Sequence, residues 1–254
     1  MDKEKQYREL IDDVKRFYEN EARLHQHEPL YLGWYDECKE INLWTYWQGR
    51  GCLDARIMLV GQDWGSPSEC SESYMAQFVE FNCGRRSAYW MDGTSITDKN
   101  LIALFSSLSY DVSNGALLNP DLFFTNFVLG YRNKGLSGGF KQRWLRENKD
   151  FFRRLAEIIE PEIIICLGRN AFHGVMMAYG QKVRVRTYNT FIVSKENPVE
   201  FFFPSGKRAY VFAEAHSGAM GTLNRSRLKD SEGVTGIELQ KKDWQRIKEY
   251  LART

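Results

Sequence analysis

Four short apolar runs, separated by segments with helical patterns, constrain the fold of this chain most strongly. Each run ends in polar residues or glycine, which is typical of parallel strands buried on both faces. The runs are Arg56–Gly61, Asp121–Leu129, Glu162–Gly168 and Arg208–Ala215. Because strands alternate with helices, the pattern predicts a sheet covered by helices on both sides. We therefore predict an α/β fold: a three-layer α/β/α sandwich with a central four-stranded parallel sheet.

Helical periodicity fills the segments between and after these runs. It predicts helices over Asn100–Leu108, Leu145–Ile159, Ala171–Ala178 and Ile237–Leu251. The second of these has a clear apolar face, and Pro161 marks its end. The chain has 254 residues without a repeat or clear linker, so we expect a single domain over 1–254 with a helical, aromatic lead-in at 1–50. This length would also accommodate two small domains.

The net charge, the cysteine spacing and the lack of long apolar runs limit the partners, cofactors and location that we expect for this protein. The net charge of +2 does not by itself indicate a nucleic-acid partner. No two of the five cysteines have C-x-x-C spacing, which gives little support to a zinc or iron–sulfur site. We expect no metal, no iron–sulfur cluster and no other cofactor. The odd cysteine count and a charged N-terminus without a signal peptide predict a cytoplasmic location. No apolar run reaches the roughly 18–20 residues of a membrane span, so we expect no membrane partner, and we expect a monomer.

Positive charge is concentrated in two stretches of the chain. The first runs from 132 to 154, where only Glu147 and Asp150 oppose eight basic residues: Arg132, Lys134, Lys141, Arg143, Arg146, Lys149, Arg153 and Arg154. The second holds Arg225, Arg227 and Lys229. Local basic clusters can follow a phosphate backbone. The alternative is that both stretches are solvated helix or loop faces.

Polar residues come late in, or directly after, three of the predicted strands. Gln62 and Asp63 follow the first strand, Asn126 lies within the second, and His216 follows the fourth. Ligands bind at the carboxyl ends of strands in sheets of this kind. A carboxylate, an amide and an imidazole would therefore meet at one edge, which core packing does not require. Taken singly, Asp63 could cap a helix, Asn126 could satisfy a loop, and His216 could be structural.

The order of these motifs resembles the uracil-DNA glycosylase superfamily over residues 56 to 227. Gly61-Gln62-Asp63 is similar to its first motif, and Asn126 to its base-reading asparagine. The segment 155–171 is similar to its helix–Pro–strand–Gly-x-x-Ala stretch, and His216-Ser217 to the start of its final motif.

Two departures from the family pattern accompany this resemblance. Trp64 stands where a proline is usual, and Gly218 and Ala219 replace the small-residue and proline pattern of the final motif. These departures bear on substrate and activity more than on fold.

The resemblance implies a monofunctional DNA glycosylase, a hydrolase of base excision repair. It would cleave the N-glycosidic bond of uracil or a related damaged base flipped out of DNA. Asp63 would orient a water and stabilise positive charge on the sugar. His216 would donate a hydrogen bond to the anion that develops on the base. Asn126 would read the base edge, and Gln62 would offer its backbone amide to the base.

Further roles follow from the same resemblance. Phe81 is the favoured stacking residue, with Tyr89 and Trp90 in the same loop as alternatives. Gly65 stands where the strict uracil-excising branch has a tyrosine against C5 of the base, which predicts tolerance of 5-substituted uracils.

The segment after His216 is expected to approach DNA. Ser217, Arg225 and Arg227 would bind phosphates, and Met220 or Leu223 would wedge into the base stack.

Two other functions fit the same residues. A nucleic-acid-binding relative without catalysis would keep the basic stretches but would not need Asp63 and His216. A nucleoside N-glycosidase acting on small molecules would keep the site but would not need the basic stretches.

Overall fold

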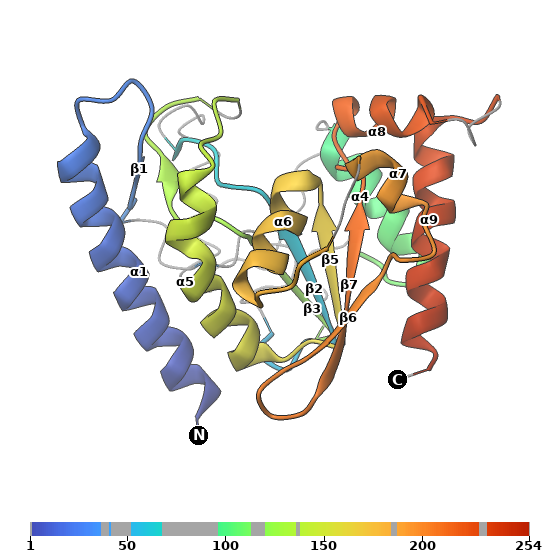
Figure 1. The fold of residues 1–254 in the computed structure, drawn as a ribbon, viewed down its shortest axis with the longest axis horizontal. Coiled ribbons are helices and arrows are strands. Elements are labelled where there is room, and N and C mark those ends of the chain that lie inside the picture. The colour runs from blue at the N-terminus through green and yellow to red at the C-terminus, as the bar shows by residue number, and fades with distance from the viewer. Residues whose placement is uncertain are drawn as a thin grey trace.

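A five-stranded sheet lies at the centre of the molecule, with the strand order β3-β2-β5-β7-β6 (Figure 1). The computed structural model describes residues 2–36, 41, 52–67, 96–112, 120–135, 138–183, 187–228 and 233–253. The strands of this sheet are β2 (Ile57–Gly61), β3 (Leu122–Asn126), β5 (Ile163–Leu167), β6 (Val199–Phe202) and β7 (Arg208–Glu214). The first three and β7 are parallel, as predicted, and β6 pairs antiparallel with β7. The α/β sandwich with four parallel strands is confirmed.

The edge strand β6 was not predicted, because its sequence does not form a continuous apolar run. Only Phe201 of its residues is buried. A tight turn joins it to β7, with the Phe203 amide donating to the Lys207 carbonyl at 2.9 Å and Gly206 at a φ of 88°. A half-exposed edge strand of this kind carries too weak a pattern to be separated from a loop.

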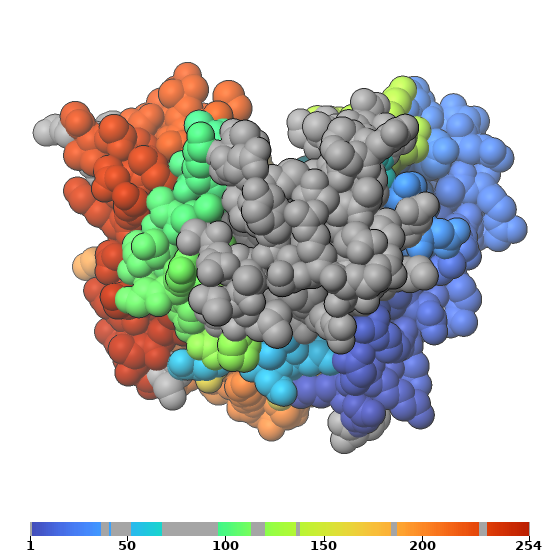
Figure 2. Space-filling model, turned by 180° about the vertical axis from the view of Figure 1, so that it is seen from behind, coloured from blue at the N-terminus to red at the C-terminus, as the bar shows by residue number. Residues whose placement is uncertain are grey.

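Helices cover both faces of the sheet (Figure 1). One layer contains α1 (Lys3–His25), α5 (Arg143–Ile159) and α6 (Arg169–Ala178), and the other contains α4 (Ile96–Ser107) and α9 (Gly236–Leu251). The short helix α7 (Tyr188–Ile192) precedes β6 in the sequence, and the short helix α8 (Ala219–Ser226) follows β7. Seen from behind, α4 and α9 lie at one end of the molecule and α1 at the other (Figure 2). Each predicted helix is present, with ends moved by a few residues.

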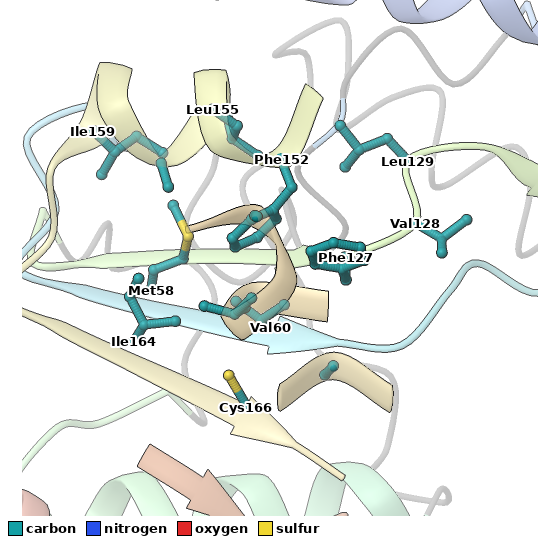
Figure 3. Packing of buried hydrophobic residues seen from close by; sticks show 14 of the residues in the cluster. Met58, Val60, Phe127, Val128, Leu129, Phe152, Leu155, Ile159, Ile164 and Cys166 are labelled. Carbon is teal, nitrogen blue, oxygen red and sulfur yellow. The ribbon is translucent and has the colours of Figure 1, made fainter. Parts of the chain in front are cut away.

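The strand sequences are apolar throughout because both faces of the sheet are buried. Every residue of β2, β3 and β5 is buried. Met58 and Ile164 face α5, where they pack with Phe152 (Figure 3). Their chain neighbours point to the opposite face, towards α4 and α9. This alternation follows from the two-residue period of a strand.

The second apolar run continues beyond the end of its strand. We predicted a strand to Leu129, whereas β3 ends at Asn126. The following Phe127 packs on Phe152, with ring centroids 4.9 Å apart, and lies against Gly174 of α6. These residues are apolar because they fill the core and not because they extend the sheet.

The N-terminal helix belongs to the same hydrophobic core as the sheet. Its buried residues Tyr7, Leu10 and Val14 lie in one cluster with Phe123 and Phe152. None of the described helices is long and apolar enough to cross a membrane.

Candidate active site

A pocket of about 740 Å³ lies at the carboxyl ends of the parallel strands. Asp63 after β2, Asn126 at the end of β3 and His216 after β7 all line it, together with Gln62. The structure therefore brings together the three side chains that the sequence placed at one sheet edge. Met220 of α8 lines the pocket as well, and its side chain is 65% exposed.

The side chain of Asn126 is accommodated by a glycine on the neighbouring strand. Asn126 and Gly61 are register partners in the β2–β3 pair. A Cβ atom at Gly61 would lie 2.1 Å from Asn126 Oδ1, so only glycine leaves room for this amide. Asn126 is 2% exposed, and its Nδ2 has no hydrogen-bond partner in the described part of the chain. Buried donors are normally satisfied, which makes this amide a candidate for contact with a ligand.

Asp63 is held by an ion pair that the sequence analysis did not predict. The Nε and Nη2 atoms of Arg132 each lie 2.6 Å from Asp63 Oδ2. The side chains of Arg132 and Asp63 are only 1% and 6% exposed. Gln62 Nε2 donates to Asp63 Oδ1 at 2.7 Å, and Asn170 Nδ2 donates to Gln62 Oε1 at 2.7 Å. Burial raises the pKa of Asp63, while the charge of Arg132 and the Gln62 hydrogen bond oppose this.

His216 has a defined hydrogen-bonding state. The backbone amide of Gly218 donates to His216 Nδ1 at 2.9 Å, so Nδ1 carries no proton. The hydrogen of the neutral ring is then on Nε2, which is free to act as a donor. Desolvation by the surrounding protein lowers the pKa of His216, although the residue as a whole is exposed. Both observations favour a neutral imidazole that donates from Nε2.

Two of the predicted phosphate contacts, Arg225 and Ser217, are wrong because both side chains are buried. Arg225 is 2% exposed and pairs with Asp243 of α9, with Nε–Oδ2 at 2.6 Å and Nη2–Oδ1 at 3.0 Å. Ser217 is fully buried. Neither side chain is accessible to DNA in this structure. We expected the segment after His216 to approach DNA, but most of it forms α8, which packs on α9. Arg227 is exposed at the end of α8 and remains available.

The basic stretch at 132–154 is also largely neutralised. Besides the Arg132–Asp63 pair, the acidic partners come mainly from the N-terminal segment and from α5 itself. The pairs are Lys141–Glu28, Arg143–Glu28, Arg154–Asp13, Arg153–Asp150 and Arg153–Glu157. Counting acidic residues only within the stretch missed the partners that tertiary packing brings to it.

The structure does not describe all of the remaining predicted site residues. Phe81 and the alternatives Tyr89 and Trp90 fall outside the described residues. Gly65 is half-buried and is not among the described residues that line the pocket. Trp64 is 2% exposed and packs against Tyr131, with ring centroids 4.9 Å apart. The tryptophan that replaces the usual proline is therefore a core residue.

Several pocket residues were missed by the sequence analysis. Arg169 is exposed at the start of α6, directly after Gly168, which caps the helix at a φ of 94°. The N-terminal ends of both α6 and α8 line the pocket, and helix N-termini favour negative charge. Asn189 of α7 and Asn224 of α8 line it too. The Gly-x-x-Ala motif after the third predicted strand was the available signal for Arg169.

The fold and the pocket together define an α/β protein that holds a carboxylate, an amide and an imidazole at the carboxyl ends of parallel strands. No protein-family model matches the chain, and no curated protein matches it either. Within the described segments, no group of three His, Cys, Asp or Glu side chains is placed to hold a metal ion.

Proposed function

We propose that the protein is a DNA glycosylase of base excision repair that hydrolyses the N-glycosidic bond of uracil or a related damaged base flipped out of DNA. The observation that carries the proposal is the buried Asn126 amide. It lacks a partner for Nδ2 within the described residues and lines the same pocket as Asp63 and His216. A base whose edge pairs with this amide would satisfy it, and the other two groups would then flank the scissile bond.

Base recognition follows from the amide of Asn126. Its Nδ2 donates to the O4 atom of uracil and its Oδ1 accepts from N3–H. Cytosine presents the opposite pattern and would leave both groups unpaired, which is a strong basis for discrimination.

Stabilisation of the leaving base falls to His216. The Gly218 amide donates to Nδ1, which leaves Nε2–H as the hydrogen-bond donor for a ligand. A preorganised donor is most effective where negative charge develops in the transition state. The N-terminal ends of α6 and α8 favour the same negative charge at the pocket.

Asp63 completes the reaction on the sugar side. As a carboxylate it offsets the positive charge that builds on the sugar when the bond to the base breaks, and it orients the attacking water.

DNA would approach over α8. Met220 and Leu223 are exposed on this helix, 65% and 42%, and are available as apolar wedges in a base stack. Arg227 remains the proposed phosphate contact of the final motif. We also propose that the protein acts as a monomer in the cytoplasm without a metal or other cofactor.

The test is an assay of abasic-site formation on oligonucleotides that carry uracil, hypoxanthine, xanthine or a G·T mismatch. Asp63→Asn and His216→Ala should each slow base release by about two orders of magnitude or more while DNA binding is kept, because both groups act mainly in the transition state. The exposed residues Asp54 and His27 provide matched controls as Asp54→Asn and His27→Ala. A wild-type protein without activity on the whole panel would favour the non-catalytic relative.

The same assay addresses the C5 substituent of the base. Gly65 carries no side chain, so we propose that 5-substituted uracils such as 5-hydroxymethyluracil are accepted. Gly65→Tyr should then narrow the range while sparing uracil. Activity restricted to unsubstituted uracil in the wild type would show that another side chain guards C5.

A nucleoside N-glycosidase is the second candidate. The pairing of Arg225 with Asp243 and the neutralised stretch at 132–154 favour it, because they reduce the charge available for a phosphate backbone. A steep fall of oligonucleotide affinity with salt would support the DNA substrate, and turnover of free nucleosides would support the alternative.

A further inference from the structure

Arg132 and Asp63 lie on two segments that run side by side. Arg132 belongs to β4 (Tyr131–Arg132), which pairs with β1 (Leu32–Gly33) in a second, two-stranded sheet. Trp64, the neighbour of Asp63, forms a parallel bridge with Tyr131, the neighbour of Arg132. The segment after β2 is therefore tied to β4 at two consecutive residues.

The guanidinium of Arg132 is oriented independently of Asp63. Its Nη1 donates to the carbonyl of Gly138, and its central carbon lies 5.5 Å from the ring centroid of Trp144. Leu32 of β1 is the register partner of Arg132 and is buried. These contacts hold the positive charge in place on an element outside the central sheet, so it can serve as a fixed partner for the carboxylate.

Only one member of the Arg132–Asp63 pair can change its protonation state near neutral pH. Arginine keeps its charge in proteins, so only Asp63 changes protonation state. Desolvation of Asp63 favours the neutral acid, and Arg132 opposes this. A neutral acid would neither offset positive charge on a sugar nor hold a water as an acceptor. The other titratable or charged groups that line the pocket in the described residues are His216, Arg169 and Tyr188.

We propose that Arg132 is a positioning residue for base release: its ion pair holds the Asp63 carboxylate ionised and in a fixed orientation at the pocket wall. This inference rests on the proposed function. Arg132 does not touch the substrate; it acts through Asp63.

The test compares Arg132→Gln with the wild type in single-turnover base release from a uracil oligonucleotide across pH. Loss of the Arg132 charge should shift the acid limb of the pH–rate profile to higher pH by about 1 to 3 units. A positive charge in contact with a carboxylate lowers the carboxyl pKa by about that much. The rate at neutral pH should fall about tenfold or more, with the Kd for DNA nearly unchanged. Arg132→Lys keeps the charge and should restore the acid limb.

Two comparisons separate positioning from a purely structural role. Arg225→Gln breaks another buried arginine–aspartate pair, with side chains 2% and 6% exposed, and should reduce stability without moving the acid limb. In an Asp63→Asn background, Arg132→Gln should add little further loss of rate, since the two residues act as one unit.

The outcomes distinguish this inference from the proposed function. An active wild type whose Arg132→Gln variant keeps the wild-type acid limb overturns the role of Arg132 alone. An inactive wild type overturns the proposed function and this inference with it. If Arg132→Gln does not fold, Arg132→Lys tests the orienting role. Lysine keeps the charge but cannot place two nitrogens against Asp63, so the rate of base release should fall. An unchanged rate would contradict the orienting role.

Discussion

At the scale of single residues, the position of the Asn126 amide depends on a glycine at position 61, because glycine has no side chain. The two residues face each other across β2 and β3, and the hypothetical Cβ at 2.1 Å from Oδ1 leaves no room for both side chains. The Gly-Gln-Asp motif therefore has a steric function besides presenting Asp63. Its glycine leaves the room that the Asn126 side chain on the next strand occupies.

Gly61→Ala should displace the Asn126 amide. We expect base release to fall by about tenfold or more, since a misplaced amide leaves the base edge unpaired, and stability to fall by about 1–3 kcal/mol from overpacking. Gly33→Ala is the control, because its Cβ would make only an ordinary contact of 3.4 Å with Ala22. Single-turnover rates and urea denaturation measure both effects. Full activity in Gly61→Ala would contradict the proposed role of Asn126.

At the scale of elements, α8 and α9 together define the position of His216. Gln240 of α9 donates from Nε2 to the carbonyls of Ala215 and His216 at 3.0 and 3.1 Å. Arg225 of α8 is fixed to Asp243 of α9 by two short contacts. A residue that the sequence presented as a surface cation is thus part of the joint between two helices. This joint also sets where the N-terminal end of α8 meets the pocket.

The Arg225–Asp243 pair should stabilise the joint only as a complete pair. Arg225→Met alone should reduce the free energy of unfolding by about 3–5 kcal/mol, because it leaves a buried carboxylate without its partner. The double variant Arg225→Met with Asp243→Leu should recover most of this loss, since apolar replacement of a buried pair is often neutral. Urea denaturation of both variants checks this. Equal losses in the single and double variants would show that the contacts of α8 do not depend on the pair.

At the scale of the whole molecule, the fold brings acidic residues from other segments to the basic stretch at 132–154. The N-terminal segment brings Asp13 and Glu28 to the basic stretch of α5, and hydrogen bonds from Lys141 and Arg143 lower the pKa of Glu28 to about 2. Arg169, which lines the pocket, and Arg227, at the end of α8, are exposed in this structure. If a nucleic acid binds at the pocket as proposed, we expect these two residues, and not the paired residues of α5, to contact its phosphates.

Salt dependence of DNA binding can locate the contact surface. Replacing Arg169 and Arg227 together by alanine should flatten the slope of log K against log salt by about two, one unit for each phosphate contact. Replacing Arg153 and Arg154 by alanine should leave the slope unchanged, because both are paired with carboxylates. Fluorescence anisotropy at several salt concentrations measures both slopes. A flattened slope only in the Arg153 and Arg154 variant would indicate that DNA binds over α5.

The amino-acid sequence by itself determined the layered α/β fold and the meeting of Asp63, Asn126 and His216 at one edge. Both follow from local rules: a strand buried on two faces must be apolar throughout, and parallel strands present their carboxyl ends together. Only the tertiary structure decided which charges are free. Arg132 and Arg225 look like surface cations in the sequence, yet each pairs with an aspartate on a different segment of the chain. A charge partner depends on which elements pack together, and no local pattern encodes that packing.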